Sequence, residues 1–263
     1  MPTEKRGLVG PENSIRRNAS DALIFCLGVI LIGCLIQILG RAKGDSLVFP
    51  GVSEILRTFF RLLLSARTYH LILTSISHLL AALIFSSAAG ILLGVLEGMS
   101  DFLRKILRPM MIMLRAMPMI VLAVIIMVLA DYSRVPVIAT SFALVPLISE
   151  AAGEGFRGID GELIDVCRLN SSFSPRVLFS VYLPLMAGYL RQSYINAVGM
   201  GMKIVITTEY LVQTKNSLGK AIFTSSYFNE FAEIYAYALI MILLVVILSE
   251  IPVLMMRRMK SHC

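Results

Sequence analysis

The chain has 263 residues, of which 57% are hydrophobic and 16% are charged, and its formal net charge is +7 at pH 7. Because soluble proteins usually carry about 25% charged residues, this composition indicates an integral membrane protein. The Lys and Arg residues lie mainly at the ends of apolar runs, as topology signals and lipid contacts do, which argues against nucleic-acid binding. The length leaves room for one membrane domain with small loops, and not for a separate catalytic domain.

Six apolar segments follow a polar, basic segment at residues 1–20. Backbone groups in lipid must be paired within their own segment, so the sequence predicts an all-α integral membrane protein with six transmembrane helices. The first segment lacks a convincing cleavage site, which favours an uncleaved span over a signal peptide. The predicted spans are roughly residues 21–40, 76–98, 109–130, 135–152, 184–208 and 234–256, within a transmembrane domain at 21–256 that contains a loop at about 153–183. A basic tail follows at 257–263.

Basic residues at the ends of the spans predict the orientation. An even number of spans places both termini on one side, and the basic pairs at 16–17 and 257–258 indicate that this side is the cytoplasm. The loop between the fourth and fifth spans is then cytoplasmic too. Basic residues between 41 and 70 would lie outside, where they alternate with apolar residues and predict an amphipathic helix in the outer interface. The apolar residues are Leu56, Phe59, Phe60 and Leu63.

A polar segment at 160–171 interrupts the apolar chain between the fourth and fifth spans. Its acidic and apolar residues recur at helical spacing as far as Val166. Asn170 and Ser171 then break the pattern, and a new apolar run begins just before Pro184. This pattern predicts a short helix, a turn and a new helix. Because spans on both sides would hold the short helix at the membrane surface, we expect it to contact a partner outside the membrane.

The same segment resembles the cytoplasmic loop of permease subunits of bacterial ATP-binding-cassette importers. That loop reads Glu-Ala-Ala, three residues, Gly, nine residues, Ile, one residue, Leu-Pro. The matching positions here are Asp165-Val166-Cys167, Ser171, Val181 and Leu183-Pro184. A more literal Glu150-Ala151-Ala152 lies fifteen residues too far upstream, and we interpret it as a decoy. The residues at 155–160 and at 208–210 are similar to the nitrate, sulfonate and taurine branch of these permeases.

This resemblance implies a multi-pass permease of the bacterial inner membrane that works by alternating access. Its implied partners are a second permease copy in a homodimer, cytoplasmic ATPase subunits and an extracytoplasmic substrate-binding protein, with ATP and Mg bound by the ATPase and no cofactor on this chain. The residues expected to couple the permease to the ATPase are Glu162, Leu163, Asp165, Val166, Cys167, Arg168, Ser171, Leu183 and Pro184.

Gly90, Gly94 and Gly98 are spaced by four residues in the second span. Small residues at this spacing let another helix approach closely, so they predict a packing seam. The seam could belong to a moving bundle or to ordinary static packing.

Several residues of the third and fifth spans are candidates for the substrate path, because charged and kinked segments are poorly suited to face lipid. They are Arg115, Met117, Pro118 and Lys203. Pro118 could mark a hinge or a fixed kink. The methionines of this span could close an adaptable gate or fill a core. Arg115 or Lys203 could bind substrate or extend to the lipid headgroups. For Glu209 we expect a structural salt bridge or cap.

No catalytic motif is present in the sequence. It contains no Gly-x-x-x-x-Gly-Lys-Ser/Thr phosphate loop, so we expect ATP hydrolysis on a separate subunit and no enzyme activity here. The Cys and His residues lack metal-ligand spacing. The alternative function is a stand-alone secondary transporter or channel, which would be expected to show internal repeats or ion-binding acids near the midplane.

Overall fold

The computed structural model describes residues 50–162 and 177–260, with residues 250–260 described by their backbone alone. Every regular element in these ranges is a helix, which confirms the predicted all-α class. The predicted first span and residues 163–171 of the coupling segment lie outside the described residues. The elements are α2 (Val52–Leu63), α3 (Ala66–Met99), α4 (Asp101–Ala116), α5 (Met119–Leu129), α6 (Val135–Arg157), the π-helix η1 (Leu178–Tyr182), α9 (Leu183–Val212), α10 (Leu218–Tyr227) and α11 (Phe231–Lys260).

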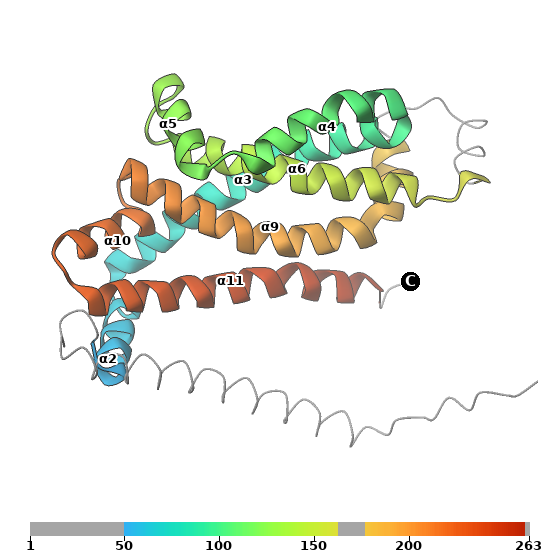
Figure 1. Cartoon of the computed structure of the whole chain (residues 1–263). Helices are drawn as coiled ribbons and strands as arrows, with labels where there is room; N and C mark the ends of the chain where they lie inside the picture. The colour runs from blue at the N-terminus through green and yellow to red at the C-terminus, as the bar shows by residue number, and fades with distance from the viewer. Residues whose placement is uncertain (1–49, 163–176, 261–263) are drawn as a thin grey trace, which may run out of the picture.

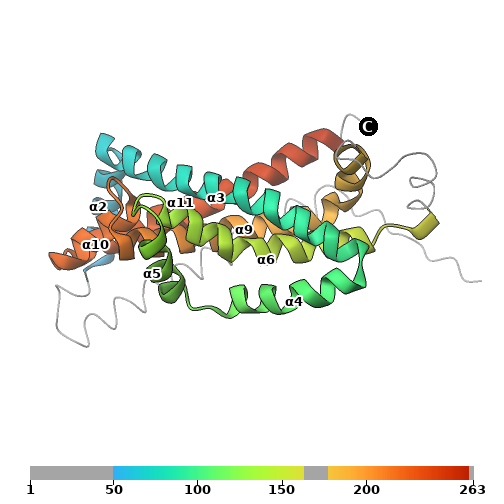
Figure 2. The ribbon, with the colours of Figure 1, turned by 90° about the horizontal axis from the view of Figure 1, so that it is seen from above.

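Four long helices, α3, α6, α9 and α11, lie side by side and form the body of the molecule (Figure 1). Helix α6 packs against α3 on one side and α9 on the other, and α11 packs against α9 and α2. We call the end where α3 and α6 finish and α4 begins the loop end, and the opposite end the α10 end. Figure 2 shows α4 returning along α6 from the loop end, and α5, which contacts α6 and α9, lying at a sharp angle to α4.

The glycines of the predicted seam lie where α3 meets α6. A Cβ atom on Gly90 would lie 2.8 Å from Cβ of Ile148, and one on Gly98 would lie 2.8 Å from Cβ of Phe156. Between them, a Cβ on Gly94 would lie 2.7 Å from Cβ of Ala152. These distances are too short for ordinary contacts, so the two helices can approach this closely only because the side chains are missing.

Three of the described helices, α3, α6 and α11, are long and apolar enough to cross a membrane, and α4 with α5 would add a fourth if the bent pair formed one span. They include the predicted second, fourth and sixth spans. Helix α9 covers the predicted fifth span but does not belong to this apolar group. The structure therefore supports a multi-span membrane protein, and the count of six remains a prediction.

The predicted span at 109–130 is divided into two helices at Pro118, where a hinge or a fixed kink was expected. Helix α4 ends at Ala116, α5 begins at Met119, and the two helices are bent by 101°. Met117 is extended (ψ 125°), as expected for a residue that precedes a proline. At about 1.5 Å per residue, α5 spans about 16 Å, roughly half the hydrocarbon thickness.

The other boundaries differ less from the predictions. Helix α3 begins at Ala66 and therefore extends the predicted second span toward the α10 end. Helix α6 continues to Arg157, so the first residues of the predicted 153–183 loop are helical. The amphipathic helix predicted within 41–70 is α2, which buries Ile55 and Leu62 and exposes Leu56 and Phe60.

Helix α10 was not predicted. It begins after Ser217, whose side-chain oxygen accepts a hydrogen bond from the backbone N–H of Lys220. This is a conventional N-cap, and it fixes the start of a short helix between α9 and α11. Figure 1 shows α10 and α2 at the same end of the bundle.

Candidate functional site

One face of α9 is polar and exposed. Gln192, Asn196, Lys203 and Thr207 are exposed on it and recur at helical spacing. The exposed residues of α11 are apolar by contrast, as Ile242 and Val246 illustrate. Polar side chains are costly against lipid, so this face of α9 is suited to water or to another protein.

Helix α6 contributes two carboxylates beside this face. A groove of about 420 Å³ lies between α6 and α9, and its lining includes Glu150, Glu154, Gln192 and Asn196. We call these four residues, with Lys203 and Thr207 farther along α9, the polar face. The groove is open in the single chain.

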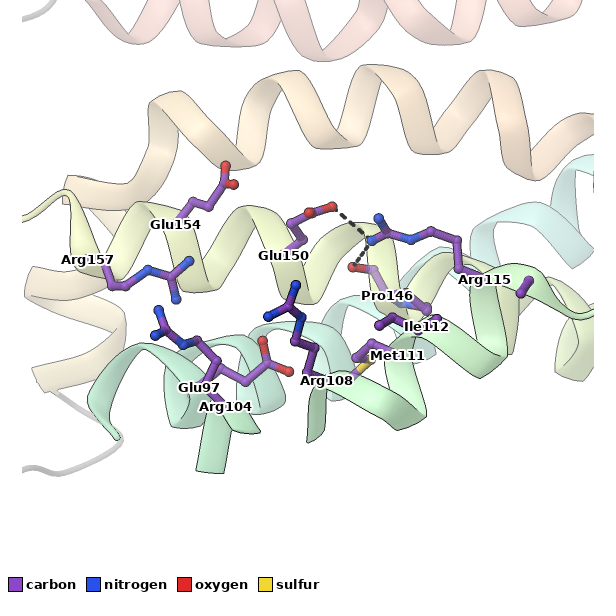
Figure 3. Close-up of a pocket in the computed structure, with 11 residues that line it drawn as sticks. Glu97, Arg104, Arg108, Met111, Ile112, Arg115, Pro146, Glu150, Glu154 and Arg157 are labelled. Carbon is purple, nitrogen blue, oxygen red and sulfur yellow. Dashed lines mark hydrogen bonds and ion pairs between the residues drawn. The ribbon is translucent and has the colours of Figure 1, made fainter. Parts of the chain in front are cut away.

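Arg115 ties α4 to the same part of α6. Its Nη2 atom lies 2.8 Å from Oε2 of Glu150 and donates a second hydrogen bond, 3.3 Å long, to the carbonyl oxygen of Pro146 (Figure 3). Both charged side chains are about half exposed, 52% for Arg115 and 53% for Glu150. The ion pair therefore lies at a boundary between protein and solvent or lipid, at the end of α4 where the chain breaks.

A second cavity, of about 650 Å³, lies between α3, α4 and α6 on the other side of Glu150. We call it the arginine cavity, and Figure 3 shows its lining. Its charged residues are Arg104, Arg108 and Arg115 of α4, Glu97 of α3, and Glu150, Glu154 and Arg157 of α6.

Glu209 forms the centre of a buried network at the α10 end. Its Oε2 atom accepts hydrogen bonds from the Ser75 hydroxyl (2.7 Å) and the Gly219 N–H (3.1 Å), and its Oε1 atom lies 2.8 Å from Nδ1 of His78. The Ser75 oxygen in turn accepts from the N–H of Leu218. A structural salt bridge or cap was predicted for Glu209, and the side chain does both: it faces His78 and accepts from the first turn of α10, so it joins α9, α3 and α10.

The predicted path residues fall in two places. Met117 and Pro118 lie in the break after α4, close in sequence to Arg115, and Met117 packs against the apolar cluster around Leu122 and Ile126. Lys203 lies on the polar face and lines neither cavity. The structure therefore does not gather these four residues into one site within a single chain.

The predicted coupling segment is described only at its edges. The N–H of Glu162 donates to the Asp160 carboxylate at 3.3 Å, and Leu183 and Pro184 open α9 directly after the π-helix. Leu163, Asp165, Val166, Cys167, Arg168 and Ser171 lie outside the described residues. By contrast, Glu150-Ala151-Ala152 lies within α6, with Ala152 fully buried, and is not part of a loop.

Reasoning from sequence missed Glu150 and Glu154 as site residues, and it missed His78 and Ser75 as partners of Glu209. A partial signal was present: Glu150 and Glu154 are spaced by four residues, as are Gln192 and Asn196, in predicted spans or beside them. The pairing of Glu209 with residues more than 130 positions away carries no such signal.

Comparison with known proteins gives the family. A family described as binding-protein-dependent transport system inner membrane component matches residues 86–261, which is more than half of the chain. The match covers the C-terminal part of α3, all of α4 to α11, and both sides of the groove. No curated protein matches the chain. The chain is thus an integral inner-membrane transport protein rather than an enzyme, and it belongs to the family of binding-protein-dependent transport system inner membrane components.

Proposed function

We propose that this protein is the permease subunit of an ATP-driven, binding-protein-dependent importer, and that the polar face lines its substrate path. The observation that carries the proposal is the polar face itself, because charged and amide side chains are exposed there, whereas α9 exposes apolar residues such as Leu185 and Met200 elsewhere. In membrane proteins such residues usually face a water-filled cavity or a partner.

A second copy of the chain completes the path in this proposal. The groove between α6 and α9 is open on one side. The neighbouring helix α5 exposes apolar residues such as Val124 and Val128, which suit contact with another apolar helix. Two copies facing each other would enclose the polar faces and cover these apolar residues, which supports a homodimer.

The coupling mechanism follows from connectivity. Helices α6 and α9 both contribute to the polar face, and the predicted coupling segment joins them directly. A displacement of this segment by a cytoplasmic ATPase would therefore tilt both walls of the groove. In the proposed cycle, ATP binding on the partner opens the path to the external binding protein, and hydrolysis returns it to the inward-open state.

Charge changes in the coupling segment test this proposal. Asp165→Lys or Val166→Asp should leave the permease inserted but release the ATPase subunits, because an unpaired charge buried at such a contact costs on the order of 2–5 kcal/mol, about 30-fold or more in affinity. Co-purification and substrate-stimulated ATP hydrolysis measure the effect. Asp101→Lys, a charge reversal at the same end of the bundle, is the matched control and should retain the ATPase.

The alternative function, a stand-alone secondary transporter or channel, predicts a different result. Uptake would then persist when the ATPase subunit is deleted, and neither coupling variant would differ from Asp101→Lys. If both coupling variants co-purify normally with the ATPase and uptake is lost when the ATPase is deleted, the coupling contact lies in another segment of the chain.

A further inference from the structure

Four arginines and three glutamates line the arginine cavity, and two of the arginines lack a close carboxylate partner among the described residues. Arg115 pairs with Glu150 at 2.8 Å, and Arg104 pairs at 2.9 Å with the exposed Asp101, three residues earlier in α4. Among the described residues, Arg108 and Arg157 have no carboxylate oxygen within 4.0 Å. Glu97 and Glu154 also line the cavity and moderate its charge, but neither forms an ion pair with a described residue at that distance.

The geometry of α4 directs its arginines toward one place. Arg104, Arg108 and Arg115 recur at helical spacing, so they share the face that α4 turns toward α6. The opposite face exposes Phe102, Ile106, Met110 and Met113. Figure 3 shows the guanidinium groups of Arg104, Arg108 and Arg157 directed into the space between α4 and α6.

From this geometry we propose that the arginine cavity binds an oxyanion of the phosphate type through Arg108 and Arg157, with Arg104 as a third donor. Guanidinium groups bind phosphate oxygens with paired, charge-assisted hydrogen bonds. Arg104 and Arg108 are four residues apart on one helix, where like charges repel, and an anion between them removes that repulsion. The volume of about 650 Å³ also accommodates the group that carries the phosphate.

Two sources could supply this chemistry. The cavity lies at the loop end, which the basic residues place at the cytoplasmic leaflet, and anionic phospholipid headgroups are concentrated there. A soluble phosphate or phosphorylated metabolite of the cytoplasm would offer the same group. In either case the ligand would bridge α4 and α6 close to the Arg115–Glu150 pair, and would thereby stabilise one position of α4.

Binding to the purified transporter tests the proposal. The complete complex is delipidated in nonionic detergent, and its unfolding temperature is followed while inorganic phosphate is added at constant ionic strength with chloride as the reference anion. In parallel, the complex is reconstituted into nanodiscs of phosphatidylcholine with or without phosphatidylglycerol. Saturable stabilisation by phosphate in detergent identifies a soluble ligand, whereas stabilisation by phosphatidylglycerol alone identifies a lipid headgroup.

Two variants of α4 provide the decisive comparison. Arg108→Gln should weaken the response to the active probe by about tenfold or more, as expected for the loss of one charge-assisted hydrogen bond. Lys105→Gln removes the same charge from the same helix but lies outside the cavity lining, and it should respond as the unmodified protein does. Equal responses of the two variants, or stabilisation by neither probe, would overturn the proposal.

These measurements involve no transport and no hydrolysis. Failure of the phosphate response would therefore leave the proposed permease function intact, and loss of coupled uptake would leave the binding result intact. Arg108 is exposed and unpaired among the described residues, so its replacement by Gln should not prevent folding.

Discussion

At the scale of single residues, Glu209 shows how a buried acidic side chain is accommodated in an apolar bundle. The carboxylate has no exposed surface, but it faces the Ser75 hydroxyl, the His78 ring and the Gly219 N–H. A buried carboxylate is expensive unless such donors surround it. The same residue closes the contact between α9 and α10, where a Cβ on Gly219 would collide with the Tyr210 backbone.

Replacing Glu209 should therefore destabilise the protein strongly. Glu209→Ala leaves the Ser75 hydroxyl and the Gly219 N–H without their acceptor, at a cost of about 2 kcal/mol or more. Thermal unfolding in detergent should show a lower unfolding temperature. The control is Glu154→Ala, which removes an exposed carboxylate that forms no ion pair with a described residue. Equal unfolding temperatures for the two variants would contradict the buried network.

Lys203 of the polar face, and Arg115, which pairs with Glu150 of that face, lead to the opposite expectation, a loss of function without a loss of stability. An exposed ion pair such as Arg115–Glu150 contributes only about 0.2–1 kcal/mol to stability. Arg115→Met and Lys203→Met should each lower uptake while expression, unfolding temperature and ATPase assembly stay unchanged. Arg134→Met and Lys215→Met change exposed bases outside the polar face and should transport normally. Wild-type uptake in Lys203→Met would remove that residue from the path.

At the scale of helices, the seam between α3 and α6 depends on missing side chains. Gly94→Ala would force a Cβ against the Ser149 carbonyl and against Ala152, so the helices must separate. We expect a destabilisation of about 1–3 kcal/mol, typical of an overpacked core. Gly199→Ala is the matched control, because its Cβ would meet only Val245 at an ordinary 3.7 Å. A gain of helix propensity of up to about 1 kcal/mol is expected there. Similar unfolding temperatures would show that the seam can relax.

Apolar runs predicted where most helices lie, but they could not show where a helix bends. The run at 109–130 is apolar except for Arg115, yet the chain breaks at Met117 and Pro118 because a residue before proline avoids helical geometry. Pro109 and Pro146, in contrast, lie inside continuous helices. Whether a proline bends, breaks or is accommodated thus depended on the packing around it, which a local pattern does not contain.

The candidate site was predictable only in part for the same reason. Lys203 and Arg115 stood out because they are charged residues in apolar surroundings. Glu150 belongs to Glu150-Ala151-Ala152, which resembles the loop motif at the wrong spacing. Its ion pair with Arg115 requires α4 to pack along α6, which the sequence does not show. Helix α10 was missed because a loop was expected there, although Ser217 offered a local N-cap signal.

At the scale of the whole molecule, the orientation across the membrane is testable by labelling. In a variant whose four cysteines are replaced by serine, Lys215→Cys should react with an impermeant maleimide added outside intact spheroplasts, because it lies at the α10 end. Ser172→Cys, in the predicted cytoplasmic loop, should react only after permeabilisation. Efficient external labelling at position 172 would show that the predicted orientation is reversed and that the arginine cavity lies at the outer leaflet.

The Glu209 network also constrains the order in which the protein can be assembled during synthesis. Ser75 and His78 lie in the first long helix described, so the translation machinery delivers them well before Glu209. The N–H groups of Leu218 and Gly219 are made later still. Until those N–H groups have been synthesised, Glu209 has only the side chains of α3 as partners, so α3 must already lie beside α9. A nascent chain in which α3 had separated from α9 would expose the Glu209 carboxylate to lipid, and quality-control proteases can recognise such a chain.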